Sequence, residues 1–173
     1  MQFPRLVLTC TALAVVAACA SRPTPPAQVP ASLRVPEDQT LFLVALASGV
    51  QIYQCTQKSD GTFAWVLESP EATLTSPEGK PLGKHYAGPT WEANDGSTVA
   101  GVVKERDPGP TDSAIPWLLL TAKATTGSGT FTPTKSIQRL ATVGGVAPHE
   151  ACGTANLKQS ARVPYTARYY FYR

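Results

Sequence analysis

Histidine is scarce in this 173-residue chain, which contains only His85 and His149. A metal site needs three or four convergent histidine, cysteine or acidic ligands, so the sequence predicts neither a metal nor another cofactor. A basic cluster is also missing, because 15 lysines and arginines are spread against 12 acidic residues for a net charge of +3. Nucleic-acid binding needs a concentrated basic face, so we expect no nucleic-acid partner.

The sequence also lacks a sustained helical stripe of apolar residues. Alternating runs flank Asp60-Gly61 and Asp95-Gly96, the strongest short-range signal of a β-hairpin. Only Ser69–Ala72 could start a helical turn, with serine as cap and proline in the first position. Other strand-like runs cover 41–47, 50–55, 98–104, 117–123, 136–142 and 165–172. The sequence therefore predicts one all-β domain over residues 37–173, an antiparallel sandwich or closed barrel of about eight or nine strands.

The first 18 residues have the order of a secretory signal peptide. Arg5 supplies a basic start, an apolar run covers 6–16, and Val16-Ala17-Ala18-Cys19 ends it with small residues before a cysteine. Ser21–Pro26 stops the apolar run short of the roughly 20 residues that a spanning helix needs. This order is typical of an exported chain that is cut before residue 19.

Cys19 at the cut resembles the lipidated cysteine of a bacterial lipoprotein. In such signals the thiol receives a diacylglyceryl group and the new N-terminus an acyl chain such as palmitate, which anchors the protein on a membrane. The alternative is an ordinary signal with an incidental cysteine. Residues 19–36, rich in proline, then form a semi-rigid spacer. Ala20 and Ser21 follow the cysteine, so we expect the cell envelope, and the outer membrane facing the periplasm if the cell has two membranes.

The remaining cysteines favour a disulfide bond. Cys10 leaves with the signal peptide and Cys19 takes lipid, which leaves Cys55 and Cys152. Two thiols in an oxidising compartment usually pair. The alternative is two separate buried thiols.

The segment Gly83–Trp91 joins a histidine, two aromatic residues, glycines and a proline, which is more than a plain connection needs. One hypothesis places His85 on a concave surface with Trp91 or Trp117 and a polar group from Lys104 or Gln138, which would suit a small polar or glycan ligand. The alternative is a sheet corner in which the aromatics are core residues.

Two further hypotheses concern polar residues. His85 with Glu92 or Asp95 could act as a general base in a hydrolase or lyase of envelope or extracellular substrates. Gln138 and Arg139 lie in an apparent strand and must face opposite sides, so one of them needs partners in the core. Lys104 and Glu92 are candidate partners.

Several ordered motifs together resemble one known family, the domain of unknown function 3455. They are Gly49–Cys55, Gly83–Trp91, Asp95–Ser97, Ile115–Leu120, Ile137–Gly145 and Val163–Ala167. The resemblance implies an exported β-rich domain, found in bacteria and fungi, without an established activity or catalytic residues to carry over. Some fungal members carry a malate dehydrogenase-like label. This chain lacks the dinucleotide fingerprint, since Thr132 and Pro133 follow Gly127-Ser128-Gly129 where a glycine and a helix are needed.

The lipid anchor is testable on the native protein. Mass spectrometry of the N-terminal peptide should find acyl groups on Cys19, and Cys19→Ala should move the protein out of the membrane fraction, because the acyl chains are the proposed anchor. A Cys19→Ala protein that stays as firmly in the membrane fraction as wild type would contradict lipidation.

Overall fold

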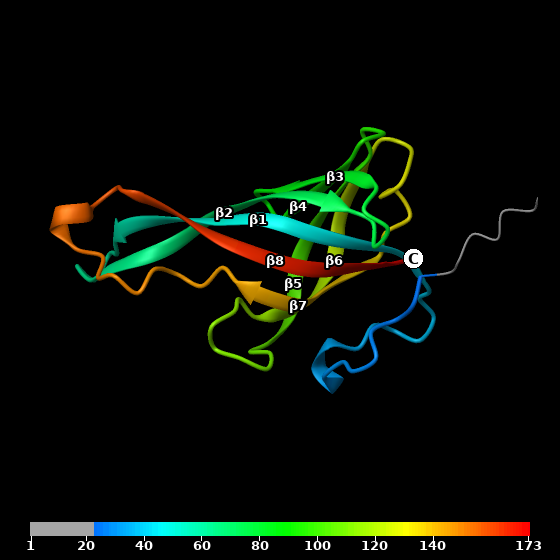
Figure 1. Ribbon diagram of the computed structural model, residues 1–173, viewed down its shortest axis with the longest axis horizontal. Helices are drawn as coiled ribbons and strands as arrows, with labels where there is room; N and C mark the ends of the chain where they lie inside the picture. Colours follow the sequence, from blue (N-terminus) through cyan, green and yellow to red (C-terminus); the bar gives the residue numbers. More distant parts are fainter. Residues whose placement is uncertain (1–22) are drawn as a thin grey trace, which may run out of the picture.

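The computed structural model describes residues 23–173 (Figure 1). The predicted signal peptide, Cys19 and the first residues of the predicted spacer lie outside this range. No helix within residues 23–173 is long and apolar enough to cross a membrane.

Eight antiparallel strands form one sheet in which each strand pairs with the next, and β8 pairs back to β1. The sheet therefore closes into a ring, and the predicted all-β architecture is confirmed. Two short 3-10 helices precede β1 and β8. The elements are η1 (Ala31–Leu33), β1 (Leu41–Gln57), β2 (Phe63–Thr75), β3 (Pro81–Tyr86), β4 (Thr90–Ala93), β5 (Thr98–Asp107), β6 (Trp117–Thr126), β7 (Ser136–Gly144), η2 (Thr154–Asn156) and β8 (Ser160–Tyr172).

Both hairpins marked by an Asp-Gly pair are confirmed, joining β1 to β2 and β4 to β5. The predicted separation of the runs 41–47 and 50–55 is wrong, because β1 continues through Ser48 and Gly49. Gly49 lies opposite Ala72, and a Cβ at position 49 would overlap the Glu71 carbonyl oxygen, so glycine permits the close approach of β2. The helical turn expected at Ser69–Ala72 is also wrong, since this segment pairs with β1.

The main core fills the interior of the ring. Its buried side chains come from seven of the strands and include Leu74, Trp91, Leu120, Ile137, Tyr169 and Phe171. Phe131, from the connection between β6 and β7, packs on Phe171 with ring centroids 4.8 Å apart. Asp95 holds this connection to the β4–β5 turn, accepting hydrogen bonds from Thr130 N and Oγ1 at 2.8 and 2.6 Å.

A second apolar cluster lies on the outer side of β6, β7 and β8. Leu33, which is fully buried, packs there with Leu119, Leu140, Tyr170 and Tyr172. Val29 and Val35 flank this contact. The segment preceding β1 therefore packs on the ring from residue 29 onward.

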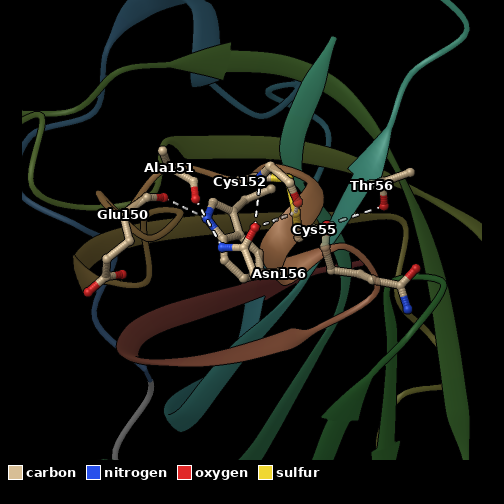
Figure 2. Close-up of a disulfide and its surroundings, with 9 residues drawn as sticks. Cys55, Thr56, Glu150, Ala151, Cys152 and Asn156 are labelled. Carbon is tan, nitrogen blue, oxygen red and sulfur yellow. Dashed lines mark hydrogen bonds between the residues drawn. A yellow bond between two sulfur atoms is a disulfide. The ribbon is translucent and has the colours of Figure 1, made fainter. Parts of the chain in front are cut away.

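A three-stranded arm extends from the ring, formed by Ile52–Gln57 of β1, Phe63–Ser69 of β2 and Ser160–Val163 of β8. The arm projects to the left in Figure 1 and ends near η2. The disulfide Cys55–Cys152 confirms the predicted pair, with Cα atoms 5.4 Å apart (Figure 2). Asn156 Nδ2 donates to Ala151 O at 2.9 Å, which orders the loop around the bridge.

The disulfide should stabilise the domain strongly, because its partners are 97 residues apart. The chain-entropy model gives ~4.7 kcal/mol for a loop of about 100 residues. We expect the double variant Cys55→Ala, Cys152→Ala to lose a few kcal/mol of unfolding free energy in urea titrations. Reduced wild type should behave like the double variant, and equal midpoints for oxidised wild type and the double variant would contradict a stabilising bridge.

Candidate functional site

A pocket of about 260 Å³ opens into the interior of the ring. Its walls come from all the strands, and the residues used below are Gln51 of β1, His85 of β3, Trp91 of β4, Val103 of β5, Leu118 of β6, Arg139 of β7 and Tyr169 of β8. The pocket also touches Leu67–Pro70 of β2, where the arm joins the ring. The ring closure thus brings together residues from distant parts of the chain.

An aromatic stack forms one wall. His85 and Trp91 are cross-strand partners, so both side chains face inward. Their rings stack with centroids 4.5 Å apart and an interplanar angle of 9°, and Tyr169 meets Trp91 edge-on at 5.2 Å. Gly101 leaves room for this arrangement, because a Cβ there would lie 3.1 Å from the Trp91 ring.

His85 is buried, and one hydrogen bond determines which of its ring nitrogens carries the proton. Its Nδ1 lies 2.8 Å from the carbonyl oxygen of Thr90, so Nδ1 carries the proton and Nε2 is left as an acceptor. Burial lowers the pKa of His85 to about 3, against a smaller opposing effect of the Thr90 hydrogen bond, and the nearby Arg139 charge lowers it further. The ring is therefore neutral at physiological pH.

Arg139 brings a positive charge into this interior. It lies between Leu118 and Tyr169 in the strand register and is half-buried. Its Nε and Nη2 donate to Pro116 O at 3.1 and 2.8 Å. Within residues 23–173 no carboxylate forms an ion pair with it, since the two pairs found there are Lys84–Glu92 and Arg162–Glu71.

Two lining residues, each about 1% exposed, hold donors without a hydrogen-bond partner within residues 23–173: Gln51 Nε2 and Trp91 Nε1. The Tyr169 hydroxyl lies beside the Tyr165 hydroxyl and Arg139, and burial raises its pKa, so it stays protonated although Arg139 and Tyr165 act in the opposite direction. An unsatisfied buried donor costs about 1–3 kcal/mol. The pocket lining therefore holds two unpartnered donors at a stability cost.

The structure brings together two of the five predicted ligand-site residues, His85 and Trp91. Lys104 is exposed and borders a shallow groove with Pro36 and Gln39. Trp117 packs at the outer cluster. Gln138 points outward, donating to Leu33 O at 2.6 Å and accepting from the Tyr172 hydroxyl at 2.7 Å.

The predicted acids do not join His85. Glu92 lies on the outer face, where it pairs with Lys84 Nζ at 3.1 Å and accepts from the Tyr86 hydroxyl at 2.9 Å. Alternation along β4 explains this, because Glu92 follows the inward-facing Trp91. Asp95 accepts from Ser97 N and Oγ at 2.9 and 2.6 Å in the β4–β5 turn.

Gln138 and Arg139 face opposite sides of β7, as alternation predicts, but their partners differ from the candidates. Leu33, Tyr172 and Pro116 provide the hydrogen bonds, and neither Lys104 nor Glu92 takes part. The predicted partners are wrong because alternation shows on which face of a strand a residue lies, but it does not show which strands become neighbours.

Sequence reasoning did not select Gln51, Arg139 and Tyr169 for the site. A signal existed for Gln51, which shares a strand face with the buried Tyr53 and Cys55. A polar residue on a core face must find partners or serve a ligand. Arg139 shows the same signal, because it lies two residues after the buried Ile137 and therefore on the same face of β7.

Among residues 23–173, no group of three or more histidine, cysteine or acidic side chains is arranged to hold a metal. The pocket's chemistry is that of a neutral histidine, a guanidinium, an amide and aromatic groups.

The sequence profile of a family described as Protein of unknown function (DUF3455) matches residues 36–173. The chain belongs to this family. The match begins just before β1 and covers all eight strands, so the ring and its pocket are the DUF3455 domain. No curated protein matches the chain, and no solved structure does either.

Buried His85 should make the stability of this DUF3455 domain depend on pH. Its folded-state pKa of about 3 lies below the ordinary 6.5, so only the unfolded chain binds a proton between these values. Stability is therefore full above pH 6.5 and falls as pH drops toward 3, by at most ~4–5 kcal/mol at 1.36 kcal/mol per pKa unit.

Urea titrations across this range should show that His85→Phe, which keeps a ring against Trp91, loses less stability on acidification than wild type. His149→Gln serves as the control, because His149 is exposed, and should follow wild type. Parallel profiles for His85→Phe and wild type would show that His85 titrates normally in the folded state.

Proposed function

We propose that this chain is a lipid-anchored protein of the cell envelope whose DUF3455 domain binds a small polar ligand in the ring pocket. The single observation that carries the binding proposal is that the pocket lining holds buried donors without partners, from Gln51 and Trp91, beside the unpaired charge of Arg139. A domain selected only for stability would fill such a space with apolar side chains, whereas a ligand can supply the missing hydrogen-bond partners.

The envelope location is supported by the N-terminal sequence and by the disulfide. The order of Arg5, the apolar run and Ala17-Ala18-Cys19 is that of a lipoprotein signal. The Cys55–Cys152 bridge is in keeping with an oxidising compartment. Lipid on Cys19 would hold the domain at a membrane and leave the ring in the aqueous phase.

Two features of the pocket favour a small ligand over a chain of sugars. The volume of about 260 Å³ lies slightly below the usual range for drug-sized ligands. His85 already covers one face of Trp91, so that face is closed to a sugar ring. We therefore place binding inside the ring.

The hydrolase or lyase hypothesis gains no support from the geometry. His85 has no carboxylate partner within residues 23–173, and its Nδ1 is held by the Thr90 carbonyl oxygen. A neutral histidine held in this way serves better as a hydrogen-bond acceptor than as the base of a catalytic pair.

The pocket can be tested with two neighbouring valines. Val103 lines the pocket, whereas Val102 is 52% exposed on the outer face. A thermal-shift screen of the full chain in detergent, with monosaccharides, amides, organic acids and alcohols as probes, should find one that raises the melting temperature, because a ligand of the folded state stabilises it.

Val103→Phe should abolish the shift by filling the pocket, and Val102→Phe should preserve it. The proposal is wrong if no probe binds, or if the shift survives Val103→Phe unchanged.

A further inference from the structure

The chemistry of the unpartnered atoms restricts the kind of ligand. Gln51 Nε2 and Trp91 Nε1 can only donate hydrogen bonds. The guanidinium of Arg139 adds further donors and a full charge. A wall so rich in donors is complemented by a ligand group that only accepts, such as an anionic oxygen.

The geometry of Arg139 leaves a suitable docking edge. The Nε and Nη2 hydrogens on one side of the guanidinium are used by Pro116 O. The other edge, formed by Nη1 and the second Nη2 hydrogen, forms no ion pair within residues 23–173, and the Tyr169 hydroxyl lies beside Arg139. Two parallel N–H groups of this kind match the two oxygens of a carboxylate.

The charge balance of the lining points to one negative charge. Arg106 and Glu68, both exposed at the rim, offset each other, and His85 is neutral, which leaves the charge of Arg139. A half-buried charge without a partner is costly, and a single counter-charge removes this cost. A dianion such as phosphate would leave one charge uncompensated inside the ring.

Size and wall composition describe the rest of the ligand. Val103, Leu118 and Leu120 provide apolar walls beside the aromatic stack. The pocket volume of about 260 Å³ admits only a small molecule. The remainder of the ligand is therefore small and apolar.

We propose that the pocket binds a small organic monocarboxylate with an apolar body, its carboxylate paired with the free edge of Arg139 and its body against Trp91 and Leu118. This inference deepens the proposed function and rests on it. Arg139 selects the ligand's charge, and the ring wall selects its size.

Benzoate and benzamide test the inference, because they share a shape and a size but differ in charge. Calorimetric titration of the full chain in detergent should show benzoate binding at least about tenfold more tightly than benzamide. Arg139→Gln should reduce this ratio to about one. Lys104→Gln removes a positive charge from β5 that lies outside the pocket. This control should leave the ratio of benzoate to benzamide affinity unchanged.

Arg139→Gln also removes the hydrogen bonds to Pro116 O, which belong to the scaffold, so Gln51→Glu provides a second test. A carboxylate at position 51 would compete for Arg139 and repel benzoate, so benzoate binding should be lost while benzamide binding remains. Wild type that binds both probes equally, or inorganic phosphate more tightly than benzoate, would overturn the monocarboxylate inference.

The two proposals fail in different ways. A probe without a carboxylate that loses its thermal shift in Val103→Phe, together with no benzoate binding, would leave the ligand pocket standing and reject only the monocarboxylate. If benzoate, benzamide and every probe of the screen fail to bind, both proposals are wrong.

Discussion

The pairing of β1 with β8 is the contact on which the rest of the structure depends. It runs from Leu41 opposite Tyr172 to Gln54 opposite Ser160, and it joins the first strand to the last. Without it the eight strands would form an open sheet with two long edges and a hydrophobic face in water. With it the sheet closes, Tyr169 and Phe171 of β8 enter the interior, and the arm gains its third strand.

Closure also brings polar side chains together inside the ring, which is unusual for a protein interior. Gln51 is on β1, Arg139 on β7 and Tyr169 on β8, and the ring register sets them around one space with the His85–Trp91 stack. Polar groups in such a place weaken the core unless they are paired. Their incomplete pairing is a local conflict with stability, the kind that natural proteins keep at functional sites.

The two apolar clusters stabilise different parts of the domain. The inner cluster, with Phe131 packed on Phe171, fills the ring and shares Trp91, Leu118 and Tyr169 with the pocket lining. The outer cluster uses Leu33 to cover Gln138, so the chain before β1 completes the domain. The disulfide at the end of the arm ties the connection between β7 and β8 to β1.

Local features of the fold follow directly from short sequence motifs. Asp60-Gly61 and Asp95-Gly96 specify hairpins because few residues accept the backbone angles of such turns, and Gly61 and Gly96 both have positive φ. Cysteine parity specified the disulfide. Alternation established that Gln138 and Arg139 face opposite sides, since the period of a strand is two.

Long-range packing determines which face of each strand is inside and which residues meet there. Alternation is symmetrical between the two faces, so it could not tell that Arg139 enters the ring while Gln138 is covered by Leu33. It could not separate Glu92 from His85 either, because that depends on the β3–β4 register. Gln51, Arg139 and Tyr169 meet through long-range strand pairing, which is fixed by the packing of the whole ring and is not encoded in any single segment.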